Sequence, residues 1–320
     1  MSPLTLLAPD SAYLVWVTVQ LVSLVSGVLL LIAALEIRLS SVGKLGLVIG
    51  SIAPLSTFAL IRYGQGQGVI LFFISLALWC AGRASWWLSP FFLGLASSFK
   101  LFTVPLIFVA LRYWGVRGLA LFVAGFTVPW IPFLAVCGAE GVRDFFLSTL
   151  PYVQSLSLSF DANISVAGAV SFTLQTFGIN ASSLTELIQG ASLFLLGALV
   201  FVECRRSQEH RELSRTVAYV VALCVMLSPT SWPHYIPLLT PLFLSLVREA
   251  QRSIDSKRDM LWVIGLYMCV GSAIGFQRGG DFIQQLVSAW WAPVWIAVAS
   301  WRLMVLSRRS RADESSLSVP

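Results

Sequence analysis

Long apolar segments follow one another from end to end of this chain, and short polar, Gly-containing or Pro-containing stretches separate them. Such runs are typical of helices that cross a membrane, which need about 20 apolar residues at a rise of ~1.5 Å per residue. Several segments are shorter and indicate short or re-entrant helices. The pattern predicts an all-α, polytopic integral membrane helical bundle with about 11 membrane segments, at 12–35, 44–61, 67–82, 86–98, 101–112, 116–137, 183–203, 216–230, 235–247, 259–276 and 287–306.

The stretch 86–112 allows two interpretations. As one helix it would place Lys100 near the middle of the membrane, where an unpaired ammonium is costly. As a hairpin of two short helices it places the SSFK sequence at a turn on the outer side. Basic residues gather on the cytoplasmic side, and the hairpin puts 17 of the 21 Lys and Arg there, leaving Arg62, Lys100, Arg143 and Arg278 outside. The charge distribution therefore favours the hairpin.

Composition supports the membrane class. Hydrophobic residues make up 57% of the chain, charged residues 11%, and the mean hydropathy is +0.83, whereas soluble domains carry about 25% charged residues. A soluble globular domain is therefore excluded. The net charge of +6 indicates orientation in the membrane and contact with anionic lipid, and not a nucleic-acid partner. The five cysteines are scattered without the spacing of a metal or redox site, so we expect no metal.

The domain boundaries follow from the same pattern. Residues 1–306 form one predicted transmembrane domain with a long outer loop at 138–182, and residues 307–320 form a basic cytoplasmic tail. We expect a multi-pass protein of the cytoplasmic membrane whose active face points outward. With a cytoplasmic C-terminus the N-terminus lies outside, yet residues 1–11 contain no basic export signal. We therefore expect the sequence to be shorter at its N-terminus than its relatives.

The most informative polar feature is a Pro-flanked break, SPTSWPHYIPLL at 228–239, between two apolar segments. It contains His234, one of only two histidines, together with Trp232 and Tyr235. Irregular backbone at membrane depth is tolerated where it lines a wet cavity, and a histidine there can move a proton. This interpretation assigns His234 to catalysis and the two aromatic neighbours to substrate. The alternative is a histidine that caps backbone groups beside ordinary interfacial aromatic residues.

Other polar residues on the predicted outer side are candidates for contact with a polar ligand. Lys100 could hold an anionic group as a point charge, or extend to the lipid headgroups. Arg278 precedes Gly-Gly-Asp, so it is a similar cation or part of a plain turn. Gln65 and Gln67 in the GQGQ sequence could form hydrogen bonds to such a ligand, or belong to a polar glycine-rich turn.

Four segments, in this order, resemble glycosyltransferase family 87, whose members are polytopic enzymes with the GT-C fold and include bacterial polyprenyl-phosphate-mannose-dependent mannosyltransferases. They are GQGQGVILFF at 64–73, GLASSFKLFTVPLIFVALRYW at 94–114, NISVAGAV at 163–170 and LSPTSWPHYIPLLTPLF at 227–243. The opening SPLTLLAPDSAYLVW resembles the segment that enters the family's second helix. The resemblance then covers residues 2 to about 250.

The resemblance implies a membrane enzyme that moves a hexose, with mannose as the first candidate, from a polyprenyl-phosphate donor to a glycolipid or glycan acceptor. It also implies that Lys100 could hold the donor phosphate and that Gln65 and Gln67 could bond sugar hydroxyls. Because the donor is a lipid, no cofactor is implied, and the partners are the lipid-linked sugar, the acceptor and membrane lipid. Asn163 and Ser165 match the family's outer-loop pattern, and Asp161 is the best-placed carboxylate in that loop. The family's acidic catalytic base lies in a loop that would precede Met1, so we expect this base to be absent.

Two other functions stay open. A non-catalytic lipid-binding partner or pseudoenzyme would fit a chain without the acidic base. A polytopic transporter or flippase is the second alternative. Against it, the sequence shows no mid-segment carboxylate to couple ions and no internal repeat.

Overall fold

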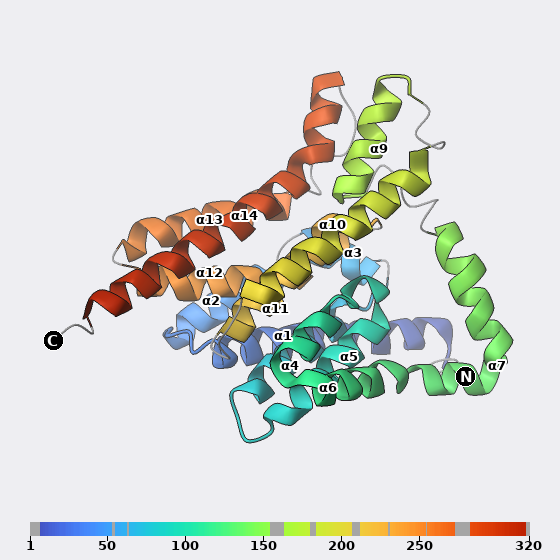
Figure 1. Ribbon diagram of the computed structural model, residues 1–320, viewed down its shortest axis with the longest axis horizontal. Coiled ribbons are helices and arrows are strands. Elements are labelled where there is room, and N and C mark those ends of the chain that lie inside the picture. The colour runs from blue at the N-terminus through green and yellow to red at the C-terminus, as the bar shows by residue number, and fades with distance from the viewer. Residues whose placement is uncertain are drawn as a thin grey trace.

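The computed structural model of the protein describes residues 7–52, 55–62, 64–153, 163–179, 184–206, 212–229, 231–253, 255–272 and 282–317. These residues form helices joined by short connections, with no strand among them (Figure 1). The prediction of an all-helical, polytopic membrane protein is confirmed. Four helical segments of the described chain are long and apolar enough to cross a membrane, namely Pro9–Ala34, Leu106–Thr127, Glu186–Arg206 and Val287–Arg308.

The helices have the following bounds. They are α1 Pro9–Ala34, α2 Ser41–Ile52, α3 Leu55–Arg62, α4 Gln67–Ala81, α5 Ser89–Phe99, α6 Leu106–Thr127, α7 Trp130–Asp144, α9 Val166–Thr176, α10 Thr185–Arg206, α11 Leu213–Leu227, α12 Thr240–Arg252, α13 Ser256–Gly271 and α14 Phe282–Leu317. Short 3₁₀ segments lie at Trp86–Leu88 (η2), Leu101–Thr103 (η3) and Pro233–Leu239 (η7), and a π-helical segment lies at Phe145–Thr149 (η4).

Helical structure continues past the predicted boundary at residue 137. α6 and α7 each contain one glycine with positive φ, Gly115 at 62° and Gly138 at 69°, which bends the chain without ending the helical run. The predicted outer loop at 138–182 therefore contains the end of α7, η4 and all of α9.

The stretch 86–112 is not one helix. α5 ends at Phe99, and Lys100 has extended backbone angles (φ −148°, ψ 112°) before η3 and α6 begin. The break is stabilised locally, because the Ser97 hydroxyl donates to the carbonyl of Thr103 at 3.0 Å and the Thr103 hydroxyl donates to the carbonyl of Lys100 at 2.9 Å. The structure thus has the two helices of the hairpin interpretation, with Lys100 at the break between them.

Two glycines allow α5 and α6 to cross with their backbones in contact. A Cβ atom at Gly94 would lie 2.0 Å from the carbonyl oxygen of Phe122, and one at Gly125 would lie 2.0 Å from that of Phe91. Small residues at helix crossings are characteristic of membrane bundles, where close van der Waals packing takes the place of a hydrophobic driving force. This crossing fixes α5, which ends at the break beside Lys100, against the last turns of α6.

α1 and the start of α4 are joined in a similar way. The amide of Gly68 donates to Oε1 of the buried Gln20 at 3.0 Å, and a Cβ at Gly68 would lie 2.4 Å from the Gln20 carbonyl oxygen. Close by, the indole N–H of Trp16 donates to the carbonyl of Gly64 at 2.7 Å. The first part of α1 therefore holds the glycine-rich turn that carries Gln65.

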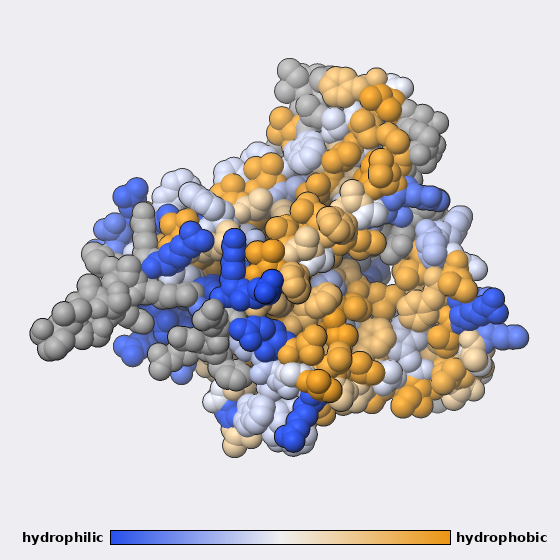
Figure 2. Space-filling view, in the orientation of Figure 1, coloured by the Kyte–Doolittle hydropathy of each residue, from blue (hydrophilic) through white to orange (hydrophobic). Residues whose placement is uncertain are grey.

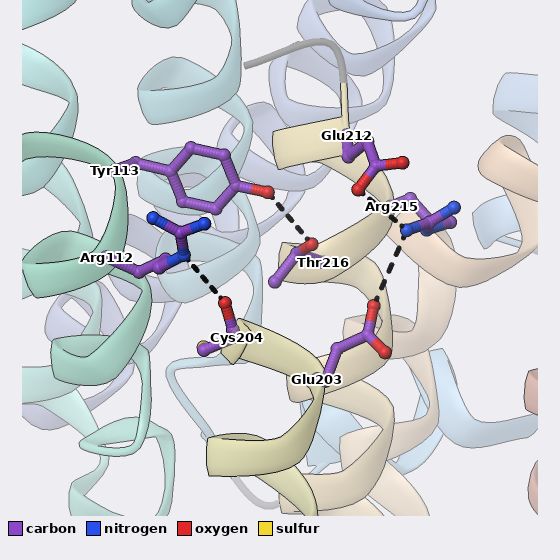
Figure 3. A network of polar contacts seen from close by, with 7 residues as sticks. All are labelled: Arg112, Tyr113, Glu203, Cys204, Glu212, Arg215 and Thr216. Atoms are coloured by element: carbon purple, nitrogen blue, oxygen red, sulfur yellow. Dashed lines mark hydrogen bonds and ion pairs between the residues drawn. The ribbon is translucent and has the colours of Figure 1, made fainter. Parts of the chain in front are cut away.

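A polar network joins α6, α10 and α11 (Figure 3). Nε of Arg112 donates to the Cys204 carbonyl at 2.8 Å, and the hydroxyls of Tyr113 and Thr216 lie 3.1 Å apart. Arg215 pairs with Glu212 at 3.1 Å and Glu203 at 3.8 Å. Thr216 lies near the start of α11, which ends at Leu227. At a rise of ~1.5 Å per residue, the two residues are about 16 Å apart along the helix.

The surface is that of a protein surrounded by lipid. Hydrophobic residues cover the middle of the face shown in Figure 2, and hydrophilic residues gather at its left and right ends. On α10, Leu187, Phe194 and Phe201 recur every seven residues and are 69%, 79% and 53% exposed. A stripe of large exposed apolar side chains on one helix face is expected where acyl chains supply the missing contacts.

The α5–α6 crossing predicts the effect of a single methyl group. In Gly94→Ala the added Cβ would overlap the Phe122 carbonyl, so we expect the free energy of unfolding in mixed micelles to fall by about 1–3 kcal/mol. Gly197→Ala in α10 is the matched control, because no atom lies within 4 Å of its Cβ position, and it should leave stability unchanged or raise it by about 0.5–1 kcal/mol. Equal effects of the two substitutions would contradict the close crossing.

Candidate functional site

Prolines create the break between α11 and α12. Ser228 leaves the helix with extended angles (φ −60°, ψ 135°), as expected for a residue that precedes a proline. Pro233 then opens η7, and Pro237 lies inside it and lacks the N–H that a regular helix would use. The carbonyl of Pro237 accepts from the backbone amide of Thr240 and, at 2.6 Å, from the Thr240 hydroxyl, where α12 begins. A buried, irregular segment results within the bundle.

Four aromatic rings meet at this break. The Trp232 and His234 rings lie 6.2 Å apart and nearly parallel (13°), while His234 and Tyr235 meet edge to face at 4.9 Å. Tyr235 stacks on Phe102 of η3 with ring centroids 4.7 Å apart and planes at 12°. His234 is 6% and Tyr235 4% exposed. The stack therefore joins the break after α11 to the break after α5.

Lys100 lies at the centre of the polar groups. Its Nζ donates to Oε1 of Gln65 at 3.0 Å, lies 3.4 Å from the Tyr235 hydroxyl, and is 5.3 Å from the centre of the Tyr235 ring. Burial lowers the pKa of Lys100 below its ordinary value. Among the described residues no carboxylate pairs with this ammonium. Three separate segments thus bring Gln65, Lys100 and Tyr235 together around a cation with neutral partners.

His234 shares the electrostatics of this cluster. Burial, and secondarily the positive charge of Lys100, lowers the pKa of His234 to about 3. The imidazole is therefore neutral at pH 7 in the free protein. An anion bound beside Lys100 would offset the positive charge and raise the pKa of His234, because an opposite charge favours the protonated form. Its basicity consequently depends on what Lys100 binds.

Asn163 and Ser165 lie beside the break and bond to its backbone. Nδ2 of Asn163 donates to the Pro229 carbonyl at 2.7 Å, and its Oδ1 accepts from the amides of Ser165 at 3.0 Å and Ser231 at 3.3 Å. The amide of Ile164 donates to the Ser231 carbonyl at 2.7 Å. The Ser165 hydroxyl caps α9 by accepting from Gly168 at 3.0 Å. Both predicted site residues therefore support the geometry of the break.

The remaining predicted residues are placed as follows. Gln67 is fully buried, and neither of its side-chain amide atoms has a hydrogen-bond partner in the described chain, whereas the half-buried Gln65 is turned to Lys100. Trp232 is half-buried at the edge of the aromatic stack. Asp161 and Arg278 lie outside the described residues. Within the described ranges no three His, Cys, Asp or Glu side chains are grouped as a metal site would require.

Sequence reasoning did not identify Phe102 as part of the site. It follows Lys100 by two residues in the η3 segment, and its ring covers one face of Tyr235. The available signal was its place beside a charged residue in a predicted turn. With 21 phenylalanines in the chain, this signal could not be distinguished from ordinary apolar packing.

Comparison with protein families gives a match to "Glycosyltransferase family 87" over residues 1–229, which is well over half of the 320-residue chain. The chain belongs to glycosyltransferase family 87. The resemblance found in the GQGQ, SSFK and NISVAGAV segments is thereby confirmed. The match contains Gln65, Lys100 and Asn163 and ends at Pro229, so the family assignment does not depend on the aromatic part of the break.

Among curated proteins, this family 87 chain is similar to an alpha-(1->3)-arabinofuranosyltransferase of Corynebacterium glutamicum. The two are 23% identical over 245 residues, which is 75% of this chain and 54% of the relative. The chain therefore spans about half the length of the curated relative that it matches. No solved structure gives a significant match.

In this family 87 chain, the hydrogen bonds of Asn163 predict that its side chain is required for the stability of the break after α11. Asn163→Ala would leave buried backbone groups of Pro229, Ser165 and Ser231 without these partners. We expect the free energy of unfolding in mixed micelles to fall by at least about 2 kcal/mol, since unsatisfied buried groups cost about 1–3 kcal/mol each. Thr176→Val removes only a hydrogen bond within α9 and should cost less than about 1 kcal/mol. Similar small losses for both variants would show that Asn163 does not hold the break.

The pKa of His234 predicts a pH dependence of stability. Between the ordinary value of 6.5 and the folded value of about 3, the unfolded chain binds more protons than the folded chain. His234 therefore destabilises the fold as pH drops below 6.5, by about 1.4 kcal/mol per pH unit. Chemical unfolding at pH 7.5 and 5.5 should show this loss in the wild type and not in His234→Gln.

The chain's other histidine provides the control. His210→Gln should retain the pH dependence of the wild type, because it leaves His234 in place. If His234→Gln and the wild type lose the same free energy of unfolding on acidification, the buried neutral state of His234 is wrong.

Proposed function

We propose that this protein transfers a sugar from a polyprenyl-phosphate donor to a hydroxyl group of a glycolipid or glycan acceptor at the outer face of the cell membrane. The observation that supports this most directly is the half-buried Lys100 ammonium, whose partners Gln65 and Tyr235 are both neutral. Membership of glycosyltransferase family 87 supplies the reaction class. A half-buried cation without a counter-ion is costly, and a phosphate ligand would compensate its charge.

The surrounding side chains fit the remaining requirements of such a transfer. Gln65 offers an amide group beside the proposed phosphate position, as sugar recognition requires. The acceptor hydroxyl has to lose a proton as it attacks the anomeric carbon while the sugar–phosphate bond breaks and the lipid phosphate leaves. His234 is the proposed proton acceptor, because donor phosphate beside Lys100 would raise its depressed pKa towards the working pH. We propose that no cofactor takes part.

The orientation of the protein follows from its charges. We propose that the C-terminus and the basic loops lie in the cytoplasm, and that the break residues face outward. The ion pairs of Arg215 lie at the start of α11, and the break with His234 follows its end. This places the two polar groupings at opposite ends of one helix, in keeping with opposite membrane surfaces.

The identity of the transferred sugar is the part of the proposal that the sequence and structure constrain least. Mannose is the first candidate because the sequence resembles family 87 mannosyltransferases. Arabinofuranose is the second, because the curated relative acts as an arabinofuranosyltransferase by its name. The proposed phosphate contact of Lys100, and an amide group such as that of Gln65 beside it, are compatible with either sugar.

A transfer assay with reconstituted protein tests the proposal. Proteoliposomes would receive polyprenyl-phosphate mannose or polyprenyl-phosphate arabinofuranose, radiolabelled in the sugar, together with glycolipid extract as acceptor. Removing a charge-assisted phosphate contact costs about 1.5–3 kcal/mol, so Lys100→Met should lower transfer at subsaturating donor roughly tenfold to hundredfold. Lys100→Arg should retain more transfer than Lys100→Met, because the charge is kept.

Lys44→Met is the matched control, since Lys44 is an exposed lysine of α2 outside the cluster. It should transfer at the wild-type rate. Full transfer by Lys100→Met would remove the proposed role of the ammonium. If folded wild-type protein transfers neither sugar but binds the donor lipid, a non-catalytic lipid-binding protein replaces the transferase proposal.

A further inference from the structure

A second polar site lies where α1 and α12 end. It is a cavity of about 460 Å³ lined by Glu36, Arg38, Arg248, Gln251 and Arg252. Arg248, Gln251 and Arg252 belong to the last turns of α12, and Glu36 and Arg38 follow the end of α1. Three guanidinium groups therefore surround one open volume with a single carboxylate.

This cavity is remote from Lys100. Trp16 of α1 bonds to Gly64 in the glycine-rich turn, and the 18 residues from Trp16 to the end of α1 at Ala34 extend about 27 Å before Glu36 is reached. α12 likewise begins at the end of η7 and reaches Arg252 after 13 residues. The arginine cavity is thus at the other end of both helices, on the side that the basic residues assign to the cytoplasm.

The positive charges in the cavity are only partly offset within the described chain, where Glu36 and Glu249 are the carboxylates that act on Arg248. Arg38, Arg248 and Arg252 form no ion pair with any described carboxylate. One Nη of Arg248 donates to the Ser214 hydroxyl at 3.3 Å, while its Nε is buried and has no hydrogen-bond partner there. Burial and the nearby charge of Arg252 lower the pKa of Arg248, against the smaller opposing effects of Glu249 and Glu36. An anion in the cavity would relieve the repulsion between the arginines.

The backbone holds these arginines in place. The Gln251 side chain donates to the Arg38 carbonyl at 3.1 Å and so ties the end of α12 to the chain after α1. Glu36 has a positive φ of 53°, which turns the chain sharply after α1 and brings Arg38 back towards α12. The ends of α1 and α12 are therefore tied together at the cavity, and the exposed side chains of Arg38 and Arg252 extend beside it.

We infer that this cavity binds a phosphate-bearing anion. The planar fork of an arginine suits a phosphate group, and several arginines at a cytoplasmic membrane surface suit the headgroup of an anionic lipid. A volume of about 460 Å³ can accept a phosphate with its glycerol, and it can also accept a free soluble phosphate. Both sources present the same chemistry to Arg38, Arg248 and Arg252.

Lipid binding to purified protein tests the inference and separates the two sources. The wild type in detergent would be titrated with phosphatidylglycerol, with phosphatidylcholine and with inorganic phosphate, and bound lipid measured by native mass spectrometry. We expect phosphatidylglycerol to bind more tightly than phosphatidylcholine. Each arginine removed should weaken its binding about fivefold, so Arg38→Gln/Arg252→Gln should bind roughly 25-fold more weakly. Arg117→Gln is the control, because Arg117 is exposed and lies outside the cavity.

The outcomes are distinct. If inorganic phosphate alone binds with the same dependence on Arg38 and Arg252, the ligand is a soluble phosphate and the site stands. If the double variant and Arg117→Gln bind all three probes like the wild type, the site is refuted. The exposed single variant Arg252→Gln, with an unchanged unfolding midpoint without lipid, separates loss of binding from loss of structure. None of these results depends on sugar transfer.

Discussion

Backbone groups that lose their helical partners inside an apolar bundle must find others, and the candidate site of this protein is built from that requirement. At the break after α11 the buried side chain of Asn163 bonds to Pro229, Ser165 and Ser231. At the break after α5, the hydroxyl groups of Ser97 and Thr103 likewise donate hydrogen bonds to backbone carbonyls. Without water to satisfy such groups, each break would cost several kcal/mol, so the irregular segments exist only where these side chains support them.

The two breaks depend on each other. Phe102 follows one of them and Tyr235 lies in the other, and their stacked rings hold the two segments together with Lys100 beside the phenol. The glycine crossing of α5 and α6 fixes the first segment, and the α1–α4 contact fixes the turn that presents Gln65. The polar cluster is thus positioned by apolar packing around it, which leaves its cation free to select a ligand by charge.

The general fold and the location of the break could be predicted from sequence, because apolar runs and prolines act locally. Lys100, Gln65 and Tyr235 were predicted separately, and the structure brings them into one cluster. The role of Asn163 could not be predicted, since its bonds cross more than 60 residues to Pro229. The burial of Gln67 could not be predicted from the sequence either, because it depends on which face of α4 packs inward. The arginine cavity combines residues more than 200 positions apart.

The shortness of α5 has a consequence for how a ligand arrives. Its 11 residues extend about 16 Å, roughly half of a hydrocarbon core of about 30 Å. In the proposed orientation, with α5 starting at the cytoplasmic surface, Lys100 at its end would lie below the level of the outer headgroups unless the bilayer thins around this helix. A water-borne anion would have to leave its hydration shell to descend there, whereas a lipid can tilt its headgroup inward while its chain stays among its neighbours. The depth of the site in the membrane would then favour lipid-borne ligands over water-borne anions, before any side chain contacts them.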